Sequence, residues 1–203
     1  MLKRSRSIFI IISAVALLVV VGGILLFWYL TYDSNSDDIK PALFFYEADY
    51  STDILSDPEY LKLNRAISYK NGAVMISVEP ENYAETDKLL AFLAEFLNTA
   101  INGDYKSYPK YFTEGYKGKY TLPEKFTMQR IYNITIEKIS ESAEEYKGKN
   151  INQYVYMLDY MIKRNDGTLR KDIESDASIP QYLVIKEIDG ELLIDNILTY
   201  SYK

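Results

Sequence analysis

The sequence predicts an α+β protein attached to a membrane by one N-terminal helix, and three observations lead to this prediction. The first is an uncharged apolar run from Ile8 to Leu30. The second is a long amphipathic segment near the middle of the chain, with apolar residues at helical spacing. The third is a C-terminal series of apolar segments separated by Asp-Gly steps, which is typical of antiparallel strands joined by turns. We therefore expect an antiparallel sheet, a long helix that packs on it, and a small additional hairpin before that helix.

The run from Ile8 to Leu30 has the length and composition of a transmembrane helix. Its 23 residues include no charged residue and no proline. As a helix the run would be about 35 Å long, against an apolar bilayer core of about 30 Å. A helix also satisfies its own backbone hydrogen bonds in lipid. The alternative is a signal peptide cleaved after Ala16, but cleavage there would follow a short apolar run and leave an apolar new N-terminus.

Charged residues on either side of this run predict its orientation. The basic residues before it are Lys3, Arg4 and Arg6, and the acidic residues after it are Asp33, Asp37 and Asp38. Because basic flanks stay in the cytoplasm, we expect residues 1–7 to form a cytoplasmic stub. Residues 31–42 would then be a polar tether, and residues 43–203 would lie outside the cytoplasm of a bacterial cell.

Composition excludes several classes of function. All 29 acidic residues and 20 of the 23 basic residues lie beyond Leu30, which gives this region a net charge of −9. Such an acidic surface argues against nucleic acid as a partner. The chain has no histidine and no cysteine, which removes imidazole bases, thiolate nucleophiles and zinc sites. We therefore expect no catalytic residue, no metal site and no cofactor.

Residues 43–80 are expected to form a small element that contains a hairpin. Within residues 66–78, the Asn71-Gly72 pair is a strong signal for a two-residue turn. The pairing predicted around that turn places Tyr69 opposite Val74 and Ile67 opposite Ile76. Because an isolated hairpin is marginally stable in water, we expect this one to lie on another part of the domain.

Residues 81–203 are expected to form the main domain. Apolar residues at helical spacing predict a long helix from Pro80 to Asn102, ended by a glycine cap at Gly103. A short second helix is expected between Asp104 and Phe112. The predicted strands cover residues 131–139, 154–162, 182–188 and 192–198.

Two stretches of this region resemble the nuclear-transport-factor-2-like superfamily. The stretch from Phe96 to Tyr108 contains a Gly-Asp-Tyr step, and it resembles the exit of the first helix in that superfamily. Residues 182–197 resemble its last hairpin, although Leu192 stands where an aromatic residue usually follows the turn. The resemblance covers residues 81–203 and implies a curved sheet that wraps the long helix into a cone with an apolar cavity.

The same resemblance suggests a role in assembly. Membrane-anchored members of the superfamily include inner-membrane scaffold subunits of conjugation and type IV secretion machines, and the layout of this chain is similar. Our leading hypothesis is therefore a non-catalytic extracytoplasmic module that contacts other envelope proteins or itself.

A second hypothesis is a domain that binds a small ligand or a cell-wall fragment in the cone cavity. The candidate lining residues are Phe92, Phe96, Tyr108, Phe112, Tyr156 and Asp159. The alternative for the aromatic residues among them is simple packing of helix against sheet.

A third hypothesis is an enzyme similar to ketosteroid isomerase, another member of the superfamily. It requires a buried Asp159 beside a tyrosine hydroxyl in an open pocket, where its pKa would be raised. The alternative is that Asp159 pairs with a basic residue of the next strand or lies at a sheet edge.

Overall fold

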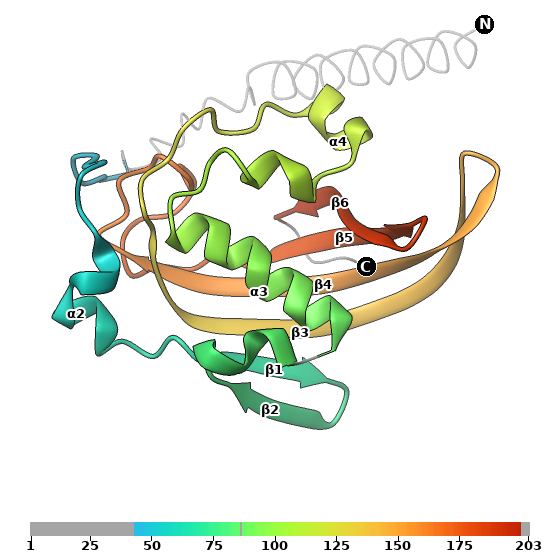
Figure 1. Cartoon of the computed structure of the whole chain (residues 1–203), viewed down its shortest axis with the longest axis horizontal. Coiled ribbons are helices and arrows are strands. Elements are labelled where there is room, and N and C mark those ends of the chain that lie inside the picture. Colours follow the sequence, from blue (N-terminus) through green and yellow to red (C-terminus); the bar gives the residue numbers. More distant parts are fainter. Residues whose placement is uncertain (1–42, 86, 200–203) are drawn as a thin grey trace, which may run out of the picture. The chain divides into compact units, whose positions relative to one another are not determined.

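The computed structural model describes residues 43–85 and 87–199, which form an α+β fold (Figure 1). A six-stranded sheet lies at its centre, in the order β2-β1-β3-β4-β5-β6. The strands are β1 (Ile67–Asn71), β2 (Val74–Val78), β3 (Arg130–Tyr146), β4 (Lys149–Lys163), β5 (Gln181–Ile188) and β6 (Glu191–Leu198). Neighbouring strands are antiparallel except for β1 and β3, which are parallel. The predicted α+β class is confirmed, and the prediction of a purely antiparallel sheet was wrong.

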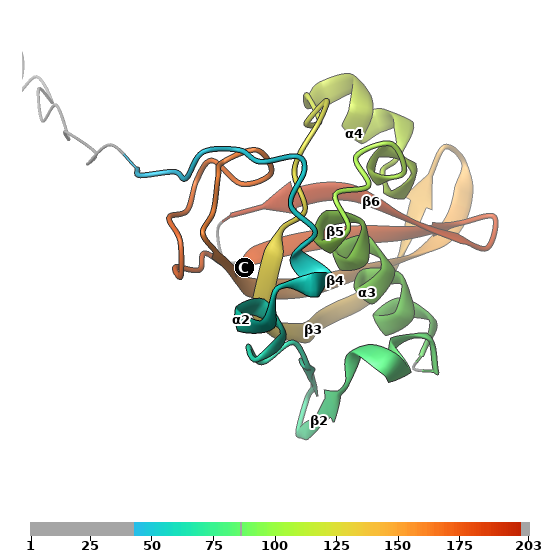
Figure 2. The ribbon, with the colours of Figure 1, turned by 60° about the vertical axis from the view of Figure 1, so that its left-hand side comes forward.

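The helix α3 lies across one face of this sheet (Figures 1 and 2). The other helical elements are η1 (Ile54–Ser56), α2 (Pro58–Leu61), η2 (Pro80–Glu85), η3 (Tyr108–Tyr111) and α4 (Glu114–Lys119), and α3 itself is Lys88–Ile101. The buried face of α3 comprises Leu90, Leu93, Ala94, Phe96, Leu97, Ala100 and Ile101. It shares one core with inward-facing strand residues, which include Ile134, Ile136, Tyr156, Leu158, Leu183 and Ile185.

The helix α3 begins later than the sequence predicts. Asp87 caps it, because its carboxylate accepts backbone hydrogen bonds from Leu89 and Leu90, each 3.0 Å long. Gly103 follows the helix with a φ of +63°, as predicted for a glycine cap. A Cβ atom at Gly103 would lie 3.0 Å from the backbone nitrogen of Met128, so glycine also permits a close approach of the next segment.

The chain after α3 also differs from its prediction. The short helix expected between Asp104 and Phe112 is reduced to the single 3-10 turn η3. The helix α4 was not predicted, because Gly115 and Gly118 suggested a break. It forms because Thr113 caps it, with its hydroxyl accepting a 3.1 Å hydrogen bond from the backbone of Tyr116.

The predicted hairpin is present with a register that is shifted by two residues. Asn71 pairs with Val74, so the turn consists of Gly72 and Ala73. The φ of Gly72 is +59°, and a type II′ turn requires such a residue at its first central position. The hairpin rests on the main domain through β1, which pairs with β3 as part of the same sheet. It is therefore an edge of the sheet and not a separate element.

The strands β3 and β4 are longer than predicted and form an arm that extends beyond the other strands (Figure 1). Lys147 and Gly148, both with positive φ, make the tight turn at its tip. The predicted Asp189-Gly190 turn is confirmed between β5 and β6. By contrast, Asp166-Gly167 lies in the loop between β4 and β5 and does not join a hairpin.

No helix within residues 43–85 and 87–199 is long and apolar enough to cross a membrane. The predicted transmembrane segment from Ile8 to Leu30, the stub and the tether all lie outside these described residues. Membrane attachment therefore stays a prediction from the sequence.

Candidate functional site

Four of the predicted pocket residues lie in one aromatic cluster beside α3. The ring centroid of Phe96 lies 5.3 Å from that of Tyr108 and 5.9 Å from that of Phe112. Phe92 joins the cluster through Tyr111, at 5.6 Å. Tyr108 and Phe112 are buried, and the stacked, tilted and edge-to-face rings of this cluster attract one another at these distances. Most of the cluster therefore packs α3 against the rest of the domain.

One side of this cluster opens into a cleft of about 1030 Å³. Phe96 and Tyr108 lie at its inner wall, and Tyr116, Tyr120 and Tyr160 add further aromatic surface. Residues 121–125 and 166–172 form the remaining walls, together with parts of β5 and β6. This volume lies at the upper end of the range for small-molecule sites, which are mostly apolar with a few polar groups.

Arg170 is a buried charged residue in the wall of this cleft. Its guanidinium donates two hydrogen bonds to the carboxylate of Asp172, at 2.7 and 2.6 Å, and lies 5.5 Å from the ring centroid of Tyr160. Burial would lower the pKa of Arg170, but hydrogen bonds to Asp172 raise it above its ordinary value. Burial would likewise raise the pKa of Asp172, and Arg170 overcomes this effect and lowers it. The two charges therefore neutralise each other.

The hydroxyls of two tyrosines of the cleft, Tyr108 and Tyr160, remain protonated. Burial raises the pKa of both Tyr108 and Tyr160 above the ordinary tyrosine value. Neutral hydroxyl groups both donate and accept hydrogen bonds. Together with the Arg170–Asp172 pair, they suit an uncharged ligand that carries hydroxyl groups or an aromatic ring.

Tyr156 and Asp159 lie away from this cleft. Tyr156 is buried between the sheet and α3. Asp159 is three residues further along β4, so its side chain points to the opposite face of the strand. Its Oδ2 atom lies 3.5 Å from the hydroxyl of Ser178, and its Oδ1 atom is buried without a hydrogen-bond partner. No basic side chain of the described region forms an ion pair with Asp159.

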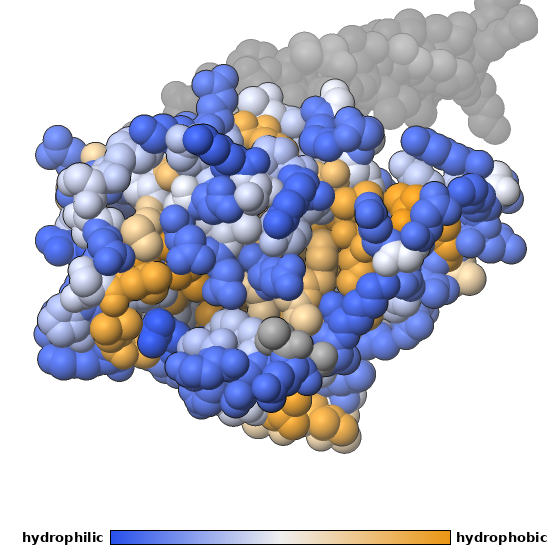
Figure 3. All heavy atoms as spheres, viewed as in Figure 1, coloured by the Kyte–Doolittle hydropathy of each residue, from blue (hydrophilic) through white to orange (hydrophobic). Residues whose placement is uncertain are grey.

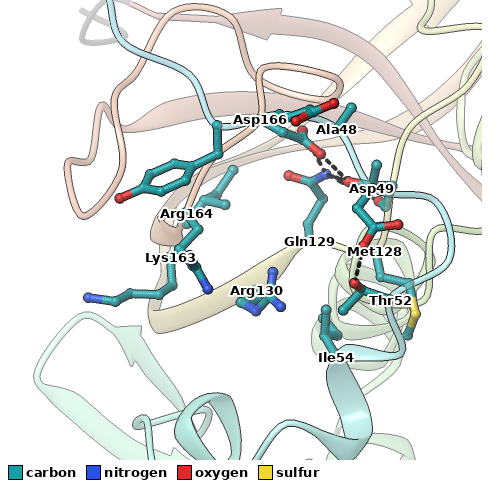
Figure 4. Close-up of a pocket in the computed structure, with 14 residues that line it drawn as sticks. Ala48, Asp49, Thr52, Ile54, Met128, Gln129, Arg130, Lys163, Arg164 and Asp166 are labelled. Carbon is teal, nitrogen blue, oxygen red and sulfur yellow. Dashed lines mark hydrogen bonds between the residues drawn. The ribbon is translucent and has the colours of Figure 1, made fainter.

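A second cleft, of about 540 Å³, lies beside residues 46–54 (Figure 4). Its polar groups mostly bind one another. Asp166 accepts a 2.5 Å hydrogen bond from Thr127, and Arg130 pairs with Asp57 at 3.2 Å. Hydrogen bonds from Ser51 and Thr52 lower the pKa of Asp49 to about 2, which makes it a weak base. This mutual pairing is typical of a structural cleft.

Exposed apolar side chains gather on β2, at the edge of the sheet. Val74, Met75 and Ile76 are 59%, 69% and 45% exposed. Figure 3 shows a hydrophobic area at the bottom of the view, in the region where Figure 1 places β2. No described strand pairs with the outer side of β2, so part of its backbone is unpaired.

This edge lacks the usual protection against strand pairing. Proteins commonly guard an edge strand with charged residues, proline or a bulge. Between Lys70 and Glu79 the chain has no charged residue and no proline, and the register of β1 with β2 is regular. The edge of β2 is therefore open to another strand.

Within the described part of the chain, no group of acidic side chains is arranged to hold a metal ion. Asp33, Asp37 and Asp38 lie outside that part.

No protein-family model matches this chain, and no curated protein or solved structure matches it at a significant level. Sequence reasoning missed Arg170 because the loop that carries it has no periodic pattern. It missed Tyr160 because only the fold brings this β4 residue next to Arg170. It also missed the open edge, although the uncharged run from Asn71 to Val78 was a visible signal.

Proposed function

We propose that residues 43–199 form an extracytoplasmic protein–protein interaction domain, and that the outer edge of β2 receives a strand of the partner. The observation that carries this proposal is an unpaired edge strand with three exposed apolar side chains and no guarding charge. In such strand addition, backbone hydrogen bonds supply affinity and side chains supply selectivity. The partner is another envelope protein or a second copy of the chain.

The predicted helix from Ile8 to Leu30 would hold this domain at the cell membrane as a single-pass protein, with its N-terminus in the cytoplasm. The run of apolar residues and the basic N-terminal flank support this part of the proposal. We also propose a relationship to the nuclear-transport-factor-2-like superfamily. It is supported by the sequence resemblance and by a long helix that lies against a sheet.

The proposal can be tested by crosslinking the full chain in its native membrane. We expect the wild-type chain to give a reproducible crosslinked complex and Ile76→Lys to lose it, because a lysine there would place a charge in the strand interface. Ile179→Lys is the matched control, since Ile179 is 39% exposed and lies in the loop between β4 and β5. A complex that survives Ile76→Lys as well as Ile179→Lys would show that β2 is not the contact.

A second candidate function is the binding of an uncharged ligand, such as a carbohydrate from the cell wall, in the 1030 Å³ cleft. It is favoured by the adjacent rings of Tyr116 and Tyr120, whose centroids are 4.7 Å apart at the cleft wall. Sugar rings pack on such aromatic surfaces.

The probe for this second function is a peptidoglycan disaccharide, titrated into the detergent-solubilised full chain. We expect Tyr120→Ala to weaken binding by about fivefold, the effect of losing one aromatic contact. Phe44→Ala serves as the control, because Phe44 is exposed and lies outside the cleft. Equal affinity of the two variants would contradict binding in this cleft.

A further inference from the structure

We infer that the strand received by β2 is β2 of a second copy of this chain, paired antiparallel about a two-fold axis at Ile76. The inference rests on the proposed function, because both place the contact at the same edge. It goes further by specifying the partner and the register.

The hairpin register decides which backbone groups of β2 are available. In a two-residue hairpin the residues that flank the turn form a hydrogen-bonded pair, and hydrogen-bonded and non-hydrogen-bonded pairs then alternate. Val74, Ile76 and Val78 therefore direct their backbone polar groups toward β1. Met75 and Ser77 direct theirs away from the sheet, so a partner strand must bind these two residues.

One symmetric register pairs both of these residues. It places Met75 opposite Ser77 of the second copy, and Ser77 opposite Met75. Each of these two pairs exchanges two backbone hydrogen bonds, which gives four across the interface. A two-fold contact of this kind uses the same surface on both copies, and it closes as a dimer.

The side chains agree with this register. Ile76 would face its own counterpart at a non-hydrogen-bonded position, where opposing Cα atoms are about 4.5 Å apart. Val74 would face Val78 of the second copy on each side of that central pair. Branched apolar residues directly opposite one another stabilise a sheet. The exposed apolar side chains on this face of β2 would therefore be covered by the same face of the second copy.

The absence of charge at this edge allows a second copy to approach it. The region beyond Leu30 has a net charge of −9, so two copies repel each other over most of their surface. The run from Asn71 to Val78 is uncharged, so copies can meet there without burying a charge. In the inferred register Glu79 lies opposite Ala73 and not opposite another acid. Attachment of both copies to one membrane would also raise their effective concentration.

The absence of cysteine from the sequence makes a sharp test available. Single variants Ile76→Cys and Val74→Cys of the full chain are oxidised in their native membrane. We expect Ile76→Cys to form a disulfide-linked dimer, because the two cysteines would be directly opposite. Val74→Cys should give at least fivefold less dimer, because its counterpart faces Val78. Both positions are exposed, and circular dichroism of each variant should match that of the wild type.

Other outcomes separate the two proposals. Equal amounts of dimer from both cysteine variants would overturn the register and with it the inference. A benzophenone maleimide attached to the single thiol of the Ile76→Cys variant and illuminated captures any neighbour, with or without a thiol. Capture of a different protein and no dimer would overturn self-pairing but support the proposed function. No capture of any protein would overturn both.

Discussion

The two edges of the sheet differ in whether other parts of the chain cover them. At β6 the chain folds back over the edge: Phe112 forms a parallel bridge with Ile194, and the backbone N–H of Thr113 donates a 3.0 Å hydrogen bond to the Ile194 carbonyl. At β2 no described segment pairs with the outer side, and apolar side chains are exposed. The described chain therefore covers the β6 edge with its own residues and leaves the β2 edge uncovered. This difference is what our proposal requires, with a covered edge that serves stability and an open edge that is free to associate.

A charge network around the buried Lys186 connects the covered edge with the arm. Lys186 on β5 is 6% exposed and pairs with Asp195 on β6 at 2.9 Å. Asp195 also accepts a 2.8 Å hydrogen bond from the hydroxyl of Thr113, the cap of α4. The arm contributes Glu144, at 3.6 Å from Lys186. Changes at this edge should therefore alter the free energy of unfolding, whereas changes at β2 should alter only self-association.

The largest effect is expected from Phe112→Ala. Phe112 is 2% exposed and contacts the rings of Phe96, Tyr108 and Tyr116, so truncation would leave a cavity where the covering segment meets the core. We expect the free energy of unfolding to fall by about 3–5 kcal/mol. Urea unfolding followed by circular dichroism measures it. Phe44→Ala is the control, because Phe44 is 65% exposed, and it should change the value by no more than about 0.5 kcal/mol.

Asp195→Ala should have the next largest effect. It would leave the buried Lys186 without its nearest carboxylate and Thr113 without its acceptor. We expect a loss of about 3 kcal/mol in the same unfolding measurement. Asp189→Asn removes the charge from an exposed pair with Lys149, and asparagine tolerates the positive φ of this turn residue, so the variant should cost less than about 1 kcal/mol. Similar losses from the two variants would contradict a special role for the buried network.

Acid should weaken the fold in part through Glu187, which lies on β5 next to the covered edge. Hydrogen bonds from Lys88, Asn152 and Tyr154 lower the pKa of Glu187 on β5 below its ordinary value. Because the folded pKa is the lower one, ionised Glu187 stabilises the fold above the unfolded pKa, which is about 4.3. This contribution is lost as the pH falls through the folded pKa.

Stability measured from pH 7 to pH 3 tests this assignment to Glu187. The difference in unfolding free energy between the wild type and Glu187→Gln should be constant near pH 7 and shrink below about pH 4. A difference that stays constant over the whole range would rule out this role. The run from Asn71 to Val78 has no titratable side chain, so the open edge should add no such term.

The smallest effect on stability is expected from Ile76→Thr. Threonine keeps the β-branched shape, and Ile76 is already 45% exposed, so the free energy of unfolding should change by no more than about 0.5 kcal/mol. The dimer should nevertheless weaken by at least fivefold in analytical ultracentrifugation of the detergent-solubilised chain. If the Ile76→Thr variant formed a dimer with the affinity of the wild type, the β2 edge would not be the site of association, and the proposed difference between the two edges would be wrong.

Elements with strong local signals could be predicted from the sequence. The periodicity of Leu90, Leu93 and Leu97 predicts α3, and Gly103 predicts its end, because both depend on neighbouring residues alone. The strand segments were found for the same reason. The start of α3 was missed because Pro80 and Asp87 both resemble helix starts, and only the fold shows which of them caps the long helix.

Features that depend on distant contacts could not be predicted in this way. The register of β5 with β6 has a bulge at Asp195, so no regular pairing gives a continuous apolar face. The parallel pairing of β1 with β3 joins segments on either side of α3. The candidate sites also depend on distant contacts. The cleft at Arg170 is formed by a loop whose sequence has no periodicity. Asp159 lies on the face of β4 away from α3, and the sequence does not show which face of that strand meets the helix.

The parallel pair of β1 and β3 has a consequence for the order of folding. The hairpin of β1 and β2 can form as soon as it is made, because its contacts are local. It cannot dock until α3 and β3 have also been made, since β3 is its only neighbour in the described sheet. During that interval both edges of an apolar hairpin are exposed. A newly made chain is therefore most open to misassembly, or to capture by a chaperone, before β3 arrives.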